Sequence, residues 1–152
     1  MQLRQIVSGG QTEFDRAALD AALACDVPVG GWCPRGRRAE DGPIAHRYPL
    51  RETPTDAYAQ RTAWNVRDSD GTLIIAPAPL GGGTALTRRE AAAREAPVLH
   101  VRLVDPVPVP MIHAWGAEAD LHVLNVVGPR ASEVDGVYCR ARTILENLLA
   151  TT

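Results

Sequence analysis

The residues of this sequence best suited to hold a ligand lie in a short polar segment directly after the apolar run at 3–7. The segment consists of Ser8, Gly9, Gly10, Gln11 and Thr12. Its glycines let the backbone approach a ligand closely, and its polar side chains offer hydrogen bonds. A helical pattern follows, so that backbone N–H groups and the positive end of a helix dipole converge there. This junction predicts a site for an anion such as phosphate.

A second segment repeats this order of apolar run, turn and helical pattern. Here Gly81, Gly82 and Gly83 can form a nest of N–H groups, and Thr84 can cap the next helix while contacting a ligand. We predict a phosphate-binding turn, with a plain flexible turn as the alternative.

Charged and amide side chains stand next to these turns and at the end of a third apolar run. Asn125 and Gly128 end that third run, and the guanidinium of Arg130 can hold an oxyanion. Asp15 and Arg16 fall in the first turn of the helix expected after Thr12. Asp15 suits ligand contact and compensation of the helix dipole equally well, and Arg130 is otherwise a surface arginine.

The pattern of apolar residues predicts the elements that position these turns. Apolar runs predict strands over 3–7, 27–31, 72–76, 98–104 and 121–127. Helical spacing predicts helices over 15–24, 84–94, 111–119 and 133–150. Another helix is expected to be capped by Thr53 or Thr55 and to run to about Arg67. Strand and helix alternate, which is typical of an α/β fold with a parallel sheet. Parallel neighbouring strands would gather all three turns at their carboxyl ends, where such sheets bind ligands.

The segment 32–54 is dense in glycine, proline, arginine and acidic residues. After Trp32 its isolated apolar residues are Ile44, Tyr48 and Leu50. Loops of this length in a compact domain are usually functional when they are ordered. Tryptophan, arginines and carboxylates together favour a binding lid, and a solvated or disordered linker is the alternative.

Length and composition limit the function classes. The 152 residues fit one domain over 1–152, and the net charge of −2 with 5% aromatic residues argues against a nucleic-acid partner. The sequence contains no apolar run of about 18 residues, the length that would predict a membrane span. Cys25, Cys33 and Cys139 have no CxxC spacing, so we expect reduced thiols in a cytoplasmic protein.

Several kinds of catalytic chemistry have no residues to support them. All 16 basic residues are arginine, so a Walker lysine and a Schiff-base lysine are excluded, whereas guanidinium groups for oxyanions are plentiful. The histidines have no metal-ligand spacing and no Cys/His set satisfies a zinc pattern, so we expect no metal held directly by side chains. No GxSxG motif is present to supply a serine nucleophile.

Blocks of sequence along almost the whole chain resemble a known family. They read SGGQT and DRAALDAAL, GWCP, GRRAEDGPI, YPL, RTAWNVRDSDGTLI, GGTALT and LNVVGPR, in this order. These blocks are similar to those of the putative molybdenum carrier family. That family belongs to a broader Rossmann-like group that includes the lysine-decarboxylase-like, cytokinin-activating phosphoribohydrolases.

This resemblance implies a fold, an assembly and a ligand. The fold is a Rossmann-like, doubly wound, mainly parallel sheet with helices on both faces, and the assembly is a homo-oligomer, either a dimer or a tetramer. The ligand is the molybdenum cofactor, an anionic pterin with a phosphate tail. Residue chemistry then suggests roles: the glycine turns for the phosphate, Arg37, Arg38 or Arg130 for anionic oxygens, Asp41, Asn65 or Asn125 for the pterin edge, and Trp32 or Trp64 for stacking.

Two positions depart from the patterns of these families. Glu13 and Phe14 replace a small pair after Thr12, and the carboxylate of Glu13 would repel a phosphate at that helix N-terminus. Thr87 stands where the phosphoribohydrolases have a catalytic glutamate. The nearest carboxylate, Glu90, lies about 4.5 Å further along the helix axis.

Three functions remain compatible with the sequence. The first is a carrier or binding protein for an anionic, nucleotide-like small molecule. The second is an enzyme that cleaves or transfers a ribosyl-phosphate bond, with Asp15, Glu40, Asp41 or Glu90 as its carboxylate, marked by a raised pKa. The third is a nucleotide-sensing module that binds without turnover.

Overall fold

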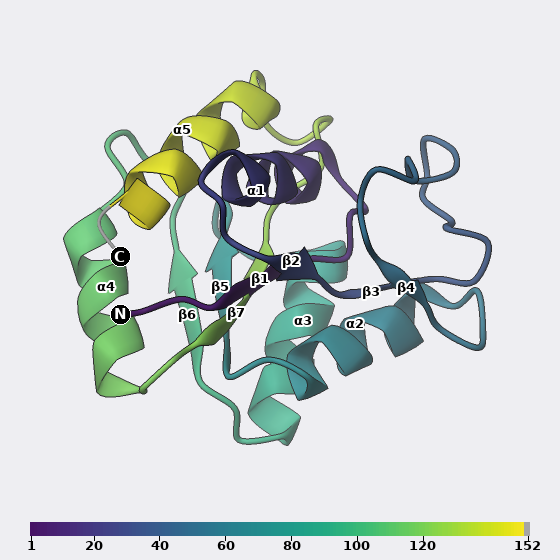
Figure 1. Ribbon diagram of the computed structural model, residues 1–152, viewed down its shortest axis with the longest axis horizontal. Helices are drawn as coiled ribbons and strands as arrows, with labels where there is room; N and C mark the ends of the chain where they lie inside the picture. The colour runs from purple at the N-terminus through teal and green to yellow at the C-terminus, as the bar shows by residue number, and fades with distance from the viewer. Residues whose placement is uncertain (151–152) are drawn as a thin grey trace.

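The computed structural model describes residues 1–150, so the last two residues of the expected 1–152 domain lie outside the described residues. Its centre is a parallel sheet of five strands in the order β2-β1-β7-β5-β6 (Figure 1). The strands are β1 Gln5–Val7, β2 Val29–Gly30, β5 Gly71–Ile75, β6 Val98–Val101 and β7 Val123–Val127. The predicted α/β class is confirmed.

Helices cover both faces of the sheet, as expected of a doubly wound fold (Figure 1). On one face α1 Glu13–Ala24 packs against α5 Val137–Ala150, and on the other α2 Tyr58–Arg67 packs against α3 Gly82–Ala93. The remaining helix, α4 Val109–Glu118, contacts α5. Helix α1 follows β1 on one face, and α3 follows β5 on the other face. The chain therefore leaves the carboxyl ends of β1 and β5, the two strands on either side of β7, towards opposite faces of the sheet.

The main core lies between the sheet and the helical layer of α1 and α5, with a contribution from α4. All of β5 is buried, which agrees with its unbroken apolar run, since a central parallel strand is covered on both faces. Strand residues Ile6, Leu73 and Leu124 share this core with Phe14 of α1 and Leu145 of α5. The core therefore fixes α1 and the strand ends relative to each other.

Several element bounds differ from the predicted ones. The strand predicted over 98–104 ends at Val101, and the helix predicted from 133 begins at Val137. Neither end carries a strong local signal in the sequence.

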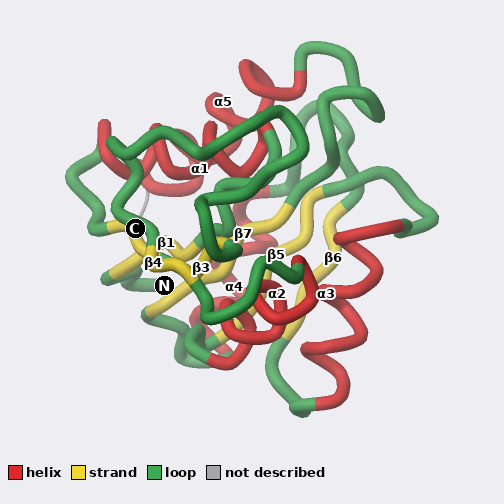
Figure 2. Tube along the Cα trace, turned by 90° about the vertical axis from the view of Figure 1, so that its right-hand side faces the viewer, coloured by secondary structure: helices red, strands yellow, loops and turns green. Residues whose placement is uncertain are grey.

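The long segment predicted as a lid or linker is a folded unit. Its ends form a second parallel pair, β3 Trp32–Cys33 with β4 Arg51–Glu52, and residues 34–50 form a loop beside it (Figures 1 and 2). The isolated apolar residues of the segment are its interior. A second cluster of buried side chains joins the loop to α1 and consists of Leu19, Cys33, Ala39, Ile44, Tyr48 and Leu50.

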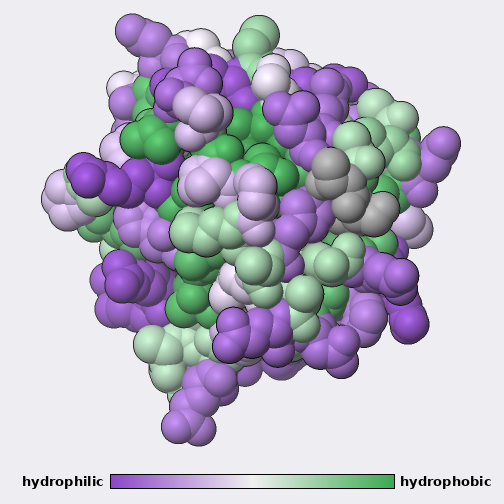
Figure 3. Space-filling view, turned by 90° about the vertical axis from the view of Figure 1, so that its left-hand side faces the viewer, coloured by the Kyte–Doolittle hydropathy of each residue, from purple (hydrophilic) through white to green (hydrophobic). Residues whose placement is uncertain are grey.

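The face that carries α4 shows apolar atoms between polar ones (Figure 3). Met111 on α4 and Val104 before it are exposed large apolar side chains. Among residues 1–150, no helix is both long and apolar enough to cross a membrane.

Candidate functional site

A cavity of about 490 Å³ opens where the turns after β1, β5 and β7 come together. The loop 34–50 and the first turns of α2 complete its wall. Its lining comes from five segments: Gln11, Thr12, Glu13 and Asp15; Glu40 and Asp41; Tyr58, Arg61 and Thr62; Gly81, Gly82, Gly83, Thr84, Leu86 and Thr87; Val127, Gly128, Arg130, Ala131, Ser132 and Glu133. The structure thus brings the three predicted turns together at one place.

The N-terminus of α3 presents backbone N–H groups to this cavity. Gly81 is the N-cap residue, and no side chain of the described residues caps the helix there. The hydroxyl of Thr84 donates to the carbonyl of Gly81 at 2.8 Å, and that of Thr87 donates to Gly83 at 2.8 Å, so neither hydroxyl accepts the first N–H groups. Gly82 has φ +52, a left-handed conformation that glycine adopts readily. The end of this helix can therefore donate to an anion.

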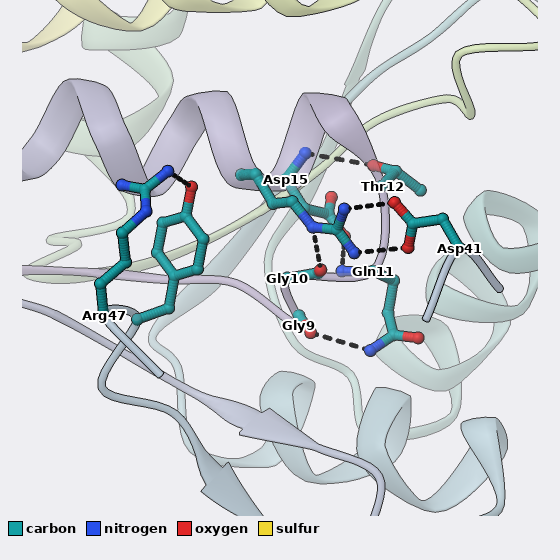
Figure 4. Close-up of polar contacts among 9 residues, drawn as sticks. Gly9, Gly10, Gln11, Thr12, Asp15, Asp41 and Arg47 are labelled. Atoms are coloured by element: carbon teal, nitrogen blue, oxygen red, sulfur yellow. Dashed lines mark hydrogen bonds and ion pairs between the residues drawn. The ribbon is translucent and has the colours of Figure 1, made fainter. Parts of the chain in front are cut away.

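The turn before α1 satisfies its own polar groups instead (Figure 4). The hydroxyl of Thr12 accepts the N–H of Asp15 at 3.1 Å, and Oδ2 of Asp15 accepts the N–H of Gln11 at 3.1 Å. The side-chain amide of Gln11 donates to the carbonyl of Gly9 at 3.0 Å. With Glu13 and Asp15 in the first helical turn, this side of the cavity is acidic.

Arg61 of α2 lies in the cavity wall between these two helix ends. Its side chain covers the backbone of Gly9, where an added Cβ would meet Nη1 at 2.7 Å, so Gly9 is required for this approach. The Nε atom is shielded from solvent and has no hydrogen-bond partner among residues 1–150. Burial lowers the pKa of Arg61, and the charge of Asp15 opposes that shift. A charged guanidinium held without a partner can pair with an anion that enters the cavity.

Asp15 and Thr62 add two more unpaired polar atoms to the same wall. Asp15 is 4% exposed, and its Oδ1 has no hydrogen-bond partner among the described residues. The same holds for the hydroxyl of Thr62, which is 2% exposed. Burial raises the pKa of Asp15, while the charge of Arg61 and the bonds from Gln11 and Thr12 lower it, leaving the pKa above its ordinary value.

Ion pairs form the rim of the cavity. Arg130 contacts Glu133 at 3.2 Å and Glu40 at 3.4 Å, and so links the turn after β7 to the loop 34–50. Nη1 and Nη2 of Arg16 donate to the two carboxylate oxygens of Asp41. The pairs of Arg130 are exposed, and such pairs contribute at most about 1 kcal/mol each.

Some predicted site residues lie behind the cavity wall and do not line it. Ser8 accepts the N–H of Gly10 at 3.1 Å, and Nε of Arg16 donates to the carbonyl of Gly10 at 2.9 Å. Asn125 is buried and donates to Thr72 at 3.2 Å. The residues with such supporting positions are Ser8, Gly9, Gly10, Arg16 and Asn125.

The structure uses Arg37 and Arg38 for purposes other than the predicted contact with a ligand. Arg37 is buried, and its guanidinium donates to four backbone carbonyls of the loop, those of Ile44, Ala45, Tyr48 and Leu50. Arg38 is exposed, donates to the carbonyl of Asp56 and stacks on the ring of Tyr58 at 4.5 Å. Neither side chain lines the cavity.

Trp32 and Asn65 line a different hollow of about 350 Å³ beside β2 and β3. Trp32 packs edge-on against Trp64 with ring centroids 4.8 Å apart and donates from Nε1 to Asp68 at 2.7 Å. Asn65 binds the backbone of Trp32 through both ends of its amide. These residues hold β3 against α2.

Sequence reasoning did not single out Arg61 and Thr62 as site residues. An arginine in a helix of mixed polarity reads as solvated, and only the packing of α2 beside α3 turns it towards the cavity. The available signal was that a block carrying the family resemblance begins at Arg61.

The donors of the cavity suit oxygen atoms better than a bare cation. Backbone N–H groups, a guanidinium and hydroxyls bind anionic oxygens. Within residues 1–150 no group of three or more histidine, cysteine, aspartate or glutamate side chains is arranged to hold a metal ion.

A parallel sheet with helices on both faces and a cavity at the carboxyl ends of β1, β5 and β7 defines a Rossmann-like α/β protein. Residues 6–149 match the model of the circularly permutated YpsA SLOG family, and the chain belongs to this family.

A solved structure extends this finding to the whole chain. The chain is similar to the crystal structure of a protein named "putative molybdenum carrier protein" from Syntrophus aciditrophicus SB. The two share 44% sequence identity, with a TM-score of 0.90 over 97% of this chain and 95% of that chain. The resemblance to the molybdenum carrier family is therefore confirmed. Among curated proteins no sequence matches the chain.

Proposed function

We propose that this chain is a binding or carrier protein for an anionic small molecule, held in the cavity at the carboxyl ends of the strands. The observation that carries the proposal is the unpaired guanidinium of Arg61, which lines the same cavity as the uncapped N-terminus of α3. Both are positive, and together they give an anion several hydrogen bonds. We further propose that the protein acts in the cytoplasm as a homo-oligomer.

The anion is expected on the α3 side of the cavity. At the α1 end, Thr12 already caps the helix and the carboxylates of Glu13 and Asp15 repel negative charge. At the α3 end, Gly81, Gly82 and Gly83 leave the backbone accessible. Our proposal places the oxygens of the ligand between this turn and Arg61.

The name of the structural neighbour supports a molybdenum compound as the cargo. In the molybdenum cofactor, the phosphate tail is the group that this donor set would hold, and the cavity volume of about 490 Å³ falls in the range of small-molecule sites. A nucleotide-like ligand has the same anionic group. The proposed ligand class is therefore an anionic pterin or nucleotide-like molecule.

A second candidate function, hydrolysis of a nucleoside monophosphate, rests on Asp15. Glu90 pairs with Arg94 and does not line the cavity, and Thr87 holds the position of the catalytic glutamate in the phosphoribohydrolases. Asp15, in contrast, is a cavity carboxyl whose pKa is raised by burial, which suits an acid or base. Incubation with AMP and detection of free adenine tests this alternative.

Isothermal titration with the molybdenum cofactor, molybdate, AMP and ribose 5-phosphate tests the binding proposal. Replacing Arg61 by Met keeps most of the apolar stem and removes the charge. We expect the affinity for each bound anion to fall about tenfold or more, as for loss of a charged hydrogen bond. Arg88→Met, which removes an exposed arginine of α3 outside the cavity, is the matched control. Equal affinities of the Arg61 variant and the wild type would contradict the proposal.

A further inference from the structure

The cavity contains a hydrogen-bond acceptor that an anion cannot satisfy. Oδ2 of Asp15 accepts the N–H of Gln11 at 3.1 Å, but Oδ1 has no partner among residues 1–150 and is shielded from solvent. Asp15 is 4% exposed, and it lines the cavity together with Arg61. A buried carboxylate oxygen without a partner is costly, so a group that completes it contributes strongly to binding.

Arg61 does not donate a hydrogen bond to Oδ1 of Asp15. The charges of the two side chains interact, yet no ion pair or hydrogen bond joins them among the contacts of the described chain. One cavity wall therefore holds an unpaired donor and an unpaired acceptor. Its best ligand offers the opposite pair: an acceptor for Arg61 and a donor for Asp15.

We infer that the ligand is an organic phosphate whose hydroxyl or ring N–H donates to Oδ1 of Asp15 while its phosphate oxygens meet Arg61 and the α3 turn. This inference rests on the proposed function and narrows it. A simple oxyanion such as molybdate offers Asp15 no donor and meets the repulsion of its charge. Asp15 is thus the residue that distinguishes an organic phosphate from a bare oxyanion.

The size of the cavity supports the same conclusion independently. Its volume of about 490 Å³ lies within the range of roughly 300–1,000 Å³ typical of sites for organic ligands. A tetrahedral oxyanion has five heavy atoms and would leave most of that space unfilled. Leu86, Val127 and Ala131 supply apolar wall next to the polar groups, which suits the carbon skeleton of a larger ligand.

Titration calorimetry on the full chain with four probes tests the inference: molybdate, inorganic phosphate, ribose 5-phosphate and AMP. In the wild type we expect ribose 5-phosphate or AMP to bind at least about tenfold more tightly than inorganic phosphate, because one more charged hydrogen bond forms. This ranking needs no variant and therefore does not depend on how a substitution folds.

The variant Asp15→Asn separates the two ligand classes. Asparagine keeps an oxygen for the N–H of Gln11 and presents an amide N–H group where the ligand donor would bind. We expect this variant to bind the organic phosphates about tenfold or more weakly than the wild type. Its affinity for molybdate should be equal or higher, since a negative charge is lost. Asp26→Asn is the charge-matched control: Asp26 is exposed beyond the end of α1, outside the cavity, at φ 57, which asparagine also adopts.

The outcomes distinguish this inference from the proposed function. If Asp15→Asn changes the affinities for all probes in the same direction, or if ribose 5-phosphate and AMP bind no tighter than phosphate, the inference is overturned. If the oxyanions still bind and need Arg61, the proposed function stands without it. If neither these probes nor the molybdenum cofactor binds to the wild type, both are overturned.

Discussion

The ring of Phe14 packs directly against the backbone of Gly128. Phe14 is fully buried, and a Cβ added to Gly128 would lie 2.1 Å from its ring. Phe14 belongs to the pair that departs from the family pattern after Thr12, and the structure shows that its ring packs on the turn after β7. A side chain at position 128 is incompatible with this packing, because two groups would occupy the same volume.

Gly128→Ala is therefore expected to destabilise the fold by about 1–3 kcal/mol. Chemical denaturation followed by circular dichroism measures this change in the free energy of unfolding. Gly83→Ala is the matched control, since an added Cβ there has nothing within 4 Å. An unchanged midpoint for Gly128→Ala would contradict the role of Phe14.

Asp15 gives a prediction about pH. Burial raises its pKa in the folded state, so its contribution to stability is present below the unfolded pKa and is lost as the pH rises through the folded pKa. The wild type should thus lose stability relative to Asp15→Asn on raising the pH from about 3.5 into the neutral range. Denaturation of both proteins at several pH values measures this difference.

The pKa of Asp41 is shifted in the opposite direction to that of Asp15, so its effect on stability has the opposite dependence on pH. The hydrogen bonds from Arg16 lower the pKa of Asp41, so its stabilisation is present at neutral pH and is lost as the pH falls through the lowered pKa. Asp41→Asn should therefore be less stable than the wild type at neutral pH, and this difference in the free energy of unfolding should disappear in acid. The same trend for Asp15→Asn and Asp41→Asn would contradict the effect of burial on Asp15.

The loop 34–50 depends on one arginine for its fold. The guanidinium of Arg37 donates to four carbonyls that face the inside of the loop, at 2.7–3.2 Å. Ile44, Tyr48 and Leu50 pack beside it against Leu19 of α1. The polar centre and the apolar cluster together fold a segment that has only two short strands.

Arg37→Ala should therefore open this loop while the central sheet stays folded. Four carbonyls would lose their donor, and three of these hydrogen bonds are buried, each costing about 1–3 kcal/mol when the acceptor is left unpaired. Hydrogen exchange measured by mass spectrometry should rise over 37–50 and remain unchanged over β5 and β7. Arg38→Ala, which removes the exposed neighbour, should leave the exchange of the loop nearly as in the wild type.

The elements also show where sequence reasoning succeeds and where it ends. The periodic runs predict all the strands of the main sheet and all the helices, because each carries an apolar pattern over several residues. The pair β3 and β4 is too short to have a pattern, and its pairing depends on contacts across 17 intervening residues, 34–50. The glycine turns are predictable from local chemistry, whereas the place of Arg61 depends on how α2 packs on α3.

The cavity lies where the chain passes to opposite faces of the sheet. Its walls come from α1 on one face and from α2 and α3 on the other, joined by the turn after β7. The alternation of strands and helices predicts this general location, since open α/β sheets bind ligands at such points. The side chains that line the cavity come from segments far apart in the sequence, so only the folded structure shows that they lie together.

The family resemblance gives a prediction about assembly. We expect a dimer or a tetramer, and the exposed apolar side chains of Met111 and Val104 are available for contact between copies. Size-exclusion chromatography with light scattering measures the mass of the particle against the 16.3 kDa chain. A particle of the single-chain mass at micromolar concentration would contradict the prediction.

The pair formed by Arg130 and Glu40 has a consequence for the residence time of a bound molecule. This exposed pair spans the opening between the turn after β7 and the loop 34–50. Salt weakens interactions between exposed charges, with a screening length of about 8 Å at 0.15 M and 3 Å at 1 M. Added salt should therefore weaken this link across the opening. Stopped-flow release of a nucleotide from the cavity should accelerate with salt more in the wild type than in Glu40→Gln, in which only the charged contacts of the ligand itself are screened.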